Sequence, residues 1–152
     1  MGDQGDKGVI ARALFMQGYN CSQCVAAAFA EEMGLPREYV MRLVSGFGGG
    51  VSRLREVCGA FSGVVFVVGA LYGNVEPSGK TATYTIVQEM ARKYREAQGS
   101  IVCKELLGLS KAEGSPVASA RTAEYYKKRP CPDLVEFAAN MMEEYIAEHP
   151  LH

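Results

Sequence analysis

The sequence predicts an all-α fold, a single-domain bundle of helices around one buried apolar helix. Apolar residues recur at the three- and four-residue spacing of a helix through most of the chain, and glycine or proline separates the segments. No run alternates apolar and polar residues between turn signals, as a half-buried strand would. A chain of 152 residues that is 48% hydrophobic can bury one core, so residues 1–152 are predicted to form one domain.

The predicted central helix is the uncharged run at residues 58–73, CGAFSGVVFVVGALYG. The run is shorter than the ~20 residues of a membrane-spanning helix, so we expect it to be buried on all sides in a protein without membrane insertion. Gly59 and Gly63, four residues apart, would let another backbone approach one face closely. Residues 64–68 are rich in β-branched side chains, but the residues around them favour helix, and helix is predicted there.

Three shorter helices are predicted before this run, and caps or breakers mark their ends. Asn20 and Gln23 have the spacing of a capping box, in which two side chains bond the backbone at a helix start. The predicted ranges are residues 6–17, ended by Gly18, residues 20–33, ended by Gly34, and residues 36–47, with Pro36 in the first position.

The chain after the central run is predicted to be helical as well, apart from one loop. In order, the predicted segments are a turn at residues 74–79, a helix at 80–98 ended by Gly99, a short helix capped by Ser100 and ended by Gly108, a loop at 109–120, a charged helical stretch at 121–128, and a last helix at 133–148 that follows a proline break. Residues 1–6 are polar and predicted to be a flexible N-terminus.

Charge and composition argue against several classes of protein. The net charge of −1 gives no reason to expect nucleic acid or an anionic membrane as a partner. The opening residues, MGDQGDKG, have the pattern of neither a secretory signal nor a transit peptide, so we expect a cytoplasmic protein. In that compartment, five cysteines are more typical of catalysis or metal binding than of a permanent disulfide framework.

Four of the cysteines share one position, because each lies within about a turn of a predicted helix N-terminus. Unpaired N–H groups and the helix dipole favour an anion there, which lowers the pKa of a thiol below its ordinary value of ~8.5 and makes the thiol more reactive. We therefore expect reactive thiols at Cys21, Cys58, Cys103 and Cys131. The alternative for each is a small buried core residue, a common fate of free cysteine.

The fifth cysteine, Cys24, forms a C-x-x-C pair with Cys21 on one face of a predicted helix. Such a pair can close a disulfide or supply half of a metal site, so Cys24 is also a candidate catalytic residue. No βαβ pattern surrounds the pair, which argues against a thioredoxin fold. The remaining cysteines are isolated in sequence, which argues against a zinc ribbon.

A glycine-rich turn at residues 48–50 precedes Cys58 and leads to Arg53 and Arg55. With Gly59, these arginines form a candidate site for a small anion or a cofactor at a helix start. The glycine spacing is that of neither a dinucleotide-binding loop nor a phosphate loop, so the alternative is a turn that only brings Cys58 into place. Both histidines lie at the C-terminus, which excludes a Cys–His hydrolase.

Four cysteine motifs occur in order along nearly the whole chain. They are N-C-S-Q around Cys21, C-G-A-x-x-G from Cys58, a cysteine before L-L-G at Cys103, and C-P-x-L-V from Cys131. This order resembles the C_GCAxxG_C_C family of redox-active proteins, which are of about this length and come mainly from anaerobic bacteria and archaea. The resemblance implies a redox role for these four cysteines. It leaves Cys24 outside the usual set, as a bystander or a local resolving partner.

The lead hypothesis is reversible thiol–disulfide exchange by a thiol–disulfide oxidoreductase, with Cys58 and Cys21 as the primary thiols and Cys103 and Cys131 completing the site. Its partner would be a redox protein, a small thiol or another electron donor, and a homo-oligomer is compatible with the sequence. The alternative is a metal site in which the same four thiolates hold an iron–sulfur cluster or zinc, and spacing does not choose between the two. A third hypothesis is an interaction module without chemistry.

Overall fold

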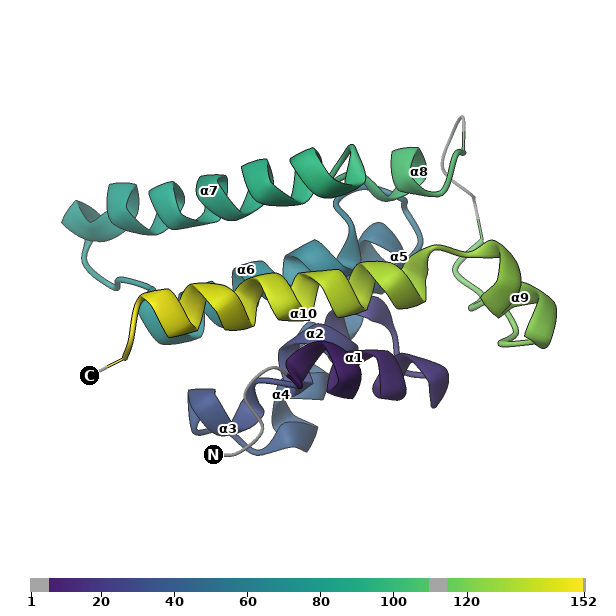
Figure 1. Cartoon of the computed structure of the whole chain (residues 1–152), viewed down its shortest axis with the longest axis horizontal. Coiled ribbons are helices and arrows are strands. Elements are labelled where there is room, and N and C mark those ends of the chain that lie inside the picture. Colours follow the sequence, from purple (N-terminus) through teal and green to yellow (C-terminus); the bar gives the residue numbers. More distant parts are fainter. Residues whose placement is uncertain (1–5, 110–114, 152) are drawn as a thin grey trace.

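A computed structural model describes residues 6–109 and 115–151, and within these ranges the chain is helical, with turns and one isolated β-bridge but no sheet (Figure 1). The predicted all-α fold is confirmed. In chain order the elements are α1 (Lys7–Met16), α2 (Cys21–Ala27), α3 (Ala30–Met33), α4 (Arg37–Val44), η1 (Ser45–Phe47), α5 (Gly48–Val51), α6 (Gly59–Tyr72), η2 (Pro77–Gly79), α7 (Lys80–Gln98), α8 (Cys103–Leu106), α9 (Ala123–Lys128) and α10 (Cys131–Glu148).

The longest helices pack side by side and enclose one main core. Helix α10 packs along α1 and also contacts α2, α6 and α7, while α6 lies between α2 and α7. The fully buried aromatic side chains of this core are Phe15, Phe29 and Tyr94. The short elements α5, α8 and α9 gather at one end of the molecule, where α10 begins (right of Figure 1). That end carries the candidate site.

Helix α6 occupies the predicted central run, and residues 64–68 are helical as predicted. The expectation that it is buried on all sides is wrong for its second half. Val65 is 36% exposed, and Gly69 and Ala70 are also exposed, because α2, α7 and α10 cover the other faces of the helix and leave this one to solvent. The buried part of α6 is the part that begins at the candidate site.

The first two glycines of α6 allow the close packing that the sequence predicts. A Cβ atom on Gly63 would lie 2.9 Å from Cβ of Val25 and 3.1 Å from the carbonyl oxygen of Ser22, both on α2. A Cβ on Gly59 would lie 3.1 Å from Cβ of Cys21. Any side chain at either position would push α6 away from α2.

Two alanine substitutions in α6 should therefore have opposite effects on stability. Gly63→Ala should lower the free energy of unfolding by about 1–3 kcal/mol, because the new methyl group overpacks against α2. Gly69→Ala should raise it by up to about 1 kcal/mol, because no atom lies within 4 Å of the added Cβ and alanine is the better helix former. Urea unfolding followed by circular dichroism measures both values. Equal effects of the two substitutions would contradict the packing described.

Several helix ends differ from the predicted ones. The capping box of Asn20 and Gln23 is present, but the helix that it starts ends at Ala27, and a separate turn, α3, continues to Gly34. Ser100 does not cap α8; its hydroxyl accepts the N–H of Val102 and donates to Glu105, so that α8 begins at Cys103.

The last helix begins at Cys131, two residues before the predicted start at Asp133. Pro132 fits in its first turn because the N–H that proline lacks would have no helical partner there. Pro36 likewise caps α4 instead of occupying its first helical position.

Two predictions fall wholly or partly on undescribed residues. Of the predicted flexible N-terminus, residues 1–5 lie outside the described part of the chain, as do residues 110–114 of the predicted loop, while residues 115–122 contain no helix. Among the described helices, none combines the length and the apolar character needed to cross a membrane.

Candidate functional site

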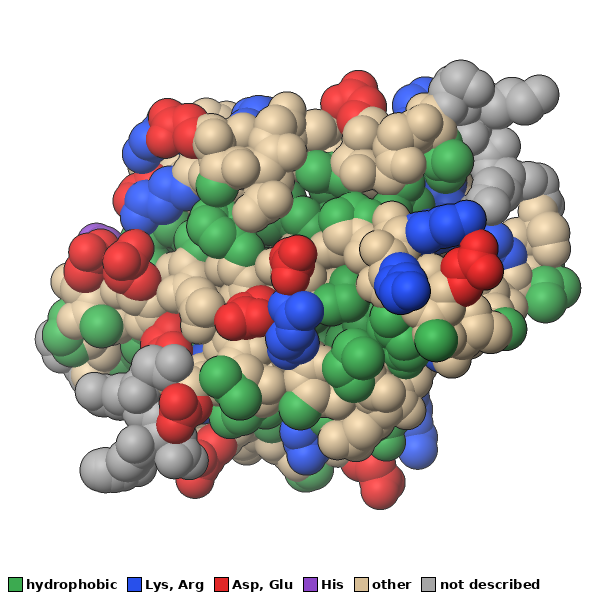
Figure 2. Space-filling view, turned by 45° about the vertical axis from the view of Figure 1, so that its right-hand side comes forward, with side chains coloured by type: hydrophobic (Ala, Val, Ile, Leu, Met, Phe, Trp, Pro, Cys, Tyr) green, Lys and Arg blue, Asp and Glu red, His purple; other side chains and the backbone are tan. Residues whose placement is uncertain are grey.

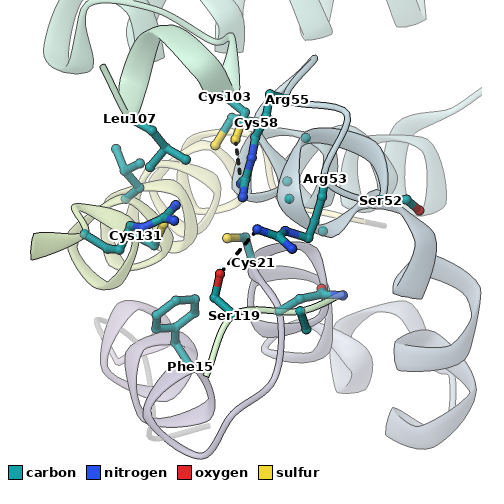
Figure 3. Close-up of a pocket in the computed structure, with 18 of the residues that line it drawn as sticks. Phe15, Cys21, Ser52, Arg53, Arg55, Cys58, Cys103, Leu107, Ser119 and Cys131 are labelled. Atoms are coloured by element: carbon teal, nitrogen blue, oxygen red, sulfur yellow. Dashed lines mark hydrogen bonds between the residues drawn. The ribbon is translucent and has the colours of Figure 1, made fainter. Parts of the chain in front are cut away.

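Four of the five cysteines line a single cavity of about 510 Å³ at the end of the bundle where α2, α6, α8 and α10 begin (Figure 3). Cys58 is the residue that caps α6, and each of the other three is the first residue of its helix. The predicted helix-start positions are thus confirmed for all four. The four side chains that the sequence grouped by position also meet in space.

A β-bridge between Val57 and Val102 holds two of these helix starts together. The N–H of Cys58 donates to the carbonyl of Ile101 at 2.7 Å, and the N–H of Cys103 donates to the carbonyl of Glu56 at 2.6 Å. These bonds fix the backbone on both sides of the bridge. They place Cys58 and Cys103 on the same wall of the cavity.

Cys58 is deeply buried and has the helix-start contacts that the sequence predicts. Its sulfur accepts the backbone N–H groups of Ala60 and Phe61, and its Sγ lies 3.4 Å from the hydroxyl of Tyr94. Burial nevertheless has the larger effect and raises the pKa of the Cys58 thiol, while these bonds lower it only in part. The expectation of a lowered pKa at this helix start is therefore wrong.

Cys103 lies beside a buried arginine, and burial again has the larger effect on the pKa of the thiol. Nη1 of Arg55 donates to its Sγ at 3.6 Å, and the Arg55 residue is only 5% exposed. Burial raises the pKa of the Cys103 thiol, and the hydrogen bond and positive charge of Arg55 offset part of that effect. The expected lowering does not occur here either.

Cys21 and Cys131 line the same cavity, and this pair contains the one thiol whose pKa falls. A side-chain hydrogen bond from Cys21 and the positive charges of Arg129, Arg121 and Arg55 lower the pKa of Cys131 to about 7, against the opposing effect of burial. The same bond keeps the proton on Cys21, whose pKa is raised well above its ordinary value, and burial adds to this. At pH 7, about half of the Cys131 thiols are therefore ionised, while Cys21 keeps its proton.

The reactivity of Cys131 should follow this pKa. Its rate of alkylation by iodoacetamide should rise through about pH 7 and level off above it, because only the thiolate reacts. Arg129→Gln should move the midpoint to higher pH, because it removes a charge that stabilises the thiolate. Mass spectrometry of the Cys131 peptide after short exposures at each pH gives the rates. A midpoint above about pH 8.5, the value for an ordinary thiol, would contradict the described site.

A strained backbone segment runs from α5 toward the start of α6 and lines the cavity. Five consecutive residues from Gly49 to Arg53 have φ values of 70, 67, 66, 50 and 67°, and Arg55 follows with 62°. Left-handed conformations cost roughly 1–2 kcal/mol for each residue with a side chain, and for a β-branched residue such as Val51 they are true outliers. Strain of this kind persists where surrounding contacts fix it, and it clusters at functional sites.

Contacts on both sides hold this strained segment and make it part of the cavity wall. The N–H of Lys104 donates to the carbonyl of Arg55, and Gly50 lies so close to Cys103 that a Cβ on Gly50 would be 2.6 Å from the cysteine Cβ. Arg53 donates to the carbonyl of Ser115 at 3.3 Å and to Oγ of Ser119 at 3.4 Å. Both predicted anion-binding arginines, and Gly59 with them, line the cavity.

Two further arginines that sequence reasoning missed also line the cavity. Arg121 donates to the carbonyls of Phe15 at 2.6 Å and Tyr19 at 2.9 Å, and its guanidinium lies 3.9 Å from the centre of the Phe15 ring. Arg129 lies 5.2 Å from the centre of the Tyr125 ring. The position of Arg129, two residues before Cys131, was the only sequence signal for this role.

Cys24 is the one predicted site residue that does not line the cavity. It is fully buried in the core, and its thiol donates to the carbonyl of Tyr19 at 3.6 Å. Burial raises the pKa of this thiol to about 12. All five cysteines are free, so the structure contains no Cys21–Cys24 disulfide.

The metal site that the sequence leaves open stays a prediction. Within residues 6–109 and 115–151, no three His, Cys, Asp or Glu side chains are grouped as the ligands of one metal ion would be. Of the cavity thiols, Cys58 contacts Tyr94 and Cys103 contacts Arg55.

The fold and the site define a small helical protein in which four cysteines line one cavity. The family model described as "Putative redox-active protein (C_GCAxxG_C_C)" matches residues 19–145. The chain therefore belongs to the C_GCAxxG_C_C family, as its cysteine motifs predict. Searches of curated proteins and of solved structures find no match to this chain.

Proposed function

We propose that the protein carries out reversible thiol–disulfide exchange, with Cys131 as the attacking thiolate and Cys21 as the resolving thiol. The observation that supports this assignment is the position of the two cysteines in one arginine-lined cavity, where the pKa of Cys131 is lowered and that of Cys21 is raised. A thiolate with a pKa near the ambient pH is the most effective attacking group, because a lower pKa reduces nucleophilicity and a higher one reduces the thiolate fraction.

The reaction consists of two successive thiol–disulfide exchanges. The Cys131 thiolate attacks one sulfur of a disulfide R–S–S–R, forms a mixed disulfide, and releases the first RS⁻. Cys21 then loses its proton to solvent or to the released thiolate and attacks the sulfur of Cys131, which releases the second RS⁻. The substrate disulfide is reduced by two electrons and the Cys21–Cys131 pair is oxidised by two. An external dithiol reverses the process and restores the free cysteines.

These roles change the order that the sequence suggests, in which Cys58 is a primary thiol. Burial raises the pKa of Cys58, and its sulfur is already bonded to the N-terminus of α6 and near Tyr94. We therefore assign neither Cys58 nor Cys103 an attack on substrate, because burial raises the pKa of both thiols.

The pairing is tested by equilibrating the reduced protein anaerobically in glutathione buffers of graded potential, then blocking free thiols and digesting without reduction. Mass spectrometry should find a Cys21–Cys131 disulfide at the most reducing potential at which any disulfide forms. Cys24→Ser is the matched control, because it removes a thiol outside the cavity and should leave the transition unchanged.

Two results of this experiment would contradict the proposal. The first is that all thiols stay reduced at every potential. The second is that stoichiometric iron or zinc, measured in the anaerobically purified protein, protects the four cavity thiols. The second result would instead support the metal site that the sequence leaves open.

A further inference from the structure

We propose that the substrate of this dithiol is a small disulfide that carries carboxylate or sulfonate groups, and that Arg121 and Arg129 bind those groups. The inference rests on the proposed thiol–disulfide exchange and adds to it the class of substrate. Three features support it: the size of the cavity, the charge of its wall and the charge of the leaving thiolate.

The size of the cavity favours a small molecule over a protein disulfide. Its volume of about 510 Å³ lies in the range of ordinary small-ligand pockets. Gly18 and Pro116 in its wall are exposed, so the cavity reaches the surface, whereas Cys131 is only 8% exposed. A disulfide must therefore enter the cavity to reach Cys131, which a folded protein partner could do only with a thin protruding loop.

The charge of the wall favours an anion. Arg121 and Arg129 are half-buried and face the same ring, with their guanidiniums 5.3 and 5.2 Å from the centre of Tyr125. Neither forms an ion pair with a described residue, and no described residue of the cavity wall is acidic. In Figure 2, basic side chains gather over the end of the molecule that holds α9.

The two arginines are also suited to hold an anionic group in a fixed position. The bonds from Arg121 to two backbone carbonyls and its stacking on Phe15 hold this guanidinium in place. A guanidinium presents a planar fork of donors that matches the two oxygens of a carboxylate or sulfonate. Attack by Cys131 on a disulfide so bound releases an anionic thiolate inside the cavity, where the same arginines stabilise the developing charge.

The test compares how fast three disulfides of similar size but different charge react with the reduced full-length protein. They are 3,3′-dithiodipropionate, which is anionic, bis(2-hydroxyethyl) disulfide, which is neutral, and cystamine, which is cationic. Each rate of mixed-disulfide formation at Cys131 is divided by the rate of the same disulfide with 2-mercaptoethanol, which removes intrinsic differences. At low ionic strength, the anionic reagent should exceed the cationic one at least about tenfold, and the ratio should fall with added salt.

Variants of Arg129 separate charge recognition from thiol activation. The side chain of Arg129 forms no hydrogen bond to another described residue, so substitution should leave the fold intact, which circular dichroism checks. Arg129→Gln should reduce the anionic-to-cationic rate ratio and Arg129→Glu should lower it further, toward a preference for cystamine. Any change in the thiolate fraction of Cys131 affects all three reagents equally and cancels in the ratio. Arg92→Gln, an exposed arginine of α7 outside the cavity, is the matched control and should leave the ratio unchanged.

The outcomes distinguish this inference from the proposed function. If Cys131 forms a mixed disulfide with all three reagents at equal normalised rates, the substrate class is wrong while thiol–disulfide exchange still holds. An unchanged ratio in both Arg129 variants likewise overturns the role of that arginine. If none of the reagents reacts at Cys131, the proposed function itself fails.

Discussion

Replacement of Cys131 by serine should lower the rate at which the protein reacts with a small disulfide at pH 7 by at least about tenfold. About half of the Cys131 thiols are ionised at that pH, because their pKa is about 7. The pKa values of the other four thiols are raised, so that less of each is ionised than the roughly 3% of an ordinary thiol at that pH. The higher nucleophilicity of a more basic thiolate recovers part of this difference.

The matching variant at the resolving position should behave differently. Cys21→Ser should still react at Cys131, because a serine hydroxyl can donate the same hydrogen bond to the thiolate. The mixed disulfide should then persist, since no second thiol bonds Cys131, and intact-mass measurement should show one retained reagent group. Cys24→Ser should retain the normal rate and resolve normally. Normal reduction of the reagent by Cys131→Ser would assign the attack to another cysteine.

Substitution of Gly50 by alanine should cause the largest loss of stability, about 3 kcal/mol or more. The glycine has a φ of 67°, and an added Cβ would lie 2.6 Å from Cβ of Cys103 and 2.8 Å from the backbone nitrogen of Glu56. The left-handed conformation costs roughly 1–2 kcal/mol for a residue with a side chain, and overpacking adds about 1–3 kcal/mol. Because backbone atoms form one side of the contact, rotation of a side chain cannot relieve it.

Gly34 provides a control with almost the same backbone conformation. Its φ is 68°, but no atom lies within 4 Å of an added Cβ. Gly34→Ala should therefore cost only the conformational strain, roughly 1–2 kcal/mol. Urea unfolding of the two variants gives the difference directly. Equal losses would show that Gly50 is needed only for its backbone angle and that the described contact with Cys103 is absent.

Local chemistry in the sequence was sufficient to predict most helices. Asn20 and Gln23 form the predicted capping box, and Gly99 ends α7 in a left-handed conformation, as a glycine after a helix usually does. The errors occur where tertiary contacts determine the residue at which a helix begins. Ser100 bonds a side chain of α8 without capping it, because the bridge between Val57 and Val102 sets where that helix begins.

The sequence predicts which cysteines form the candidate site but not the protonation state of each thiol. The motifs identify the four residues that line the cavity and leave Cys24 outside the set, as the structure does. Helix position alone predicts four acidic thiols, yet the balance of burial against nearby charge leaves one, Cys131. That balance depends on Arg121 and Arg129, which reach the cavity only through the path of the chain around α9.

The dispersal of the site along the chain has a consequence for biosynthesis. The cavity combines helix starts from Cys21 to Cys131, and the arginines that activate the last cysteine lie just before it. A chain still emerging from the ribosome therefore carries only ordinary thiols, of which roughly 3% are ionised at pH 7. Such a chain lacks the acidic thiol of the folded protein, because Cys131 gains its lowered pKa when α10 docks. Cys131 alkylation would then serve as a kinetic marker for the last step of maturation.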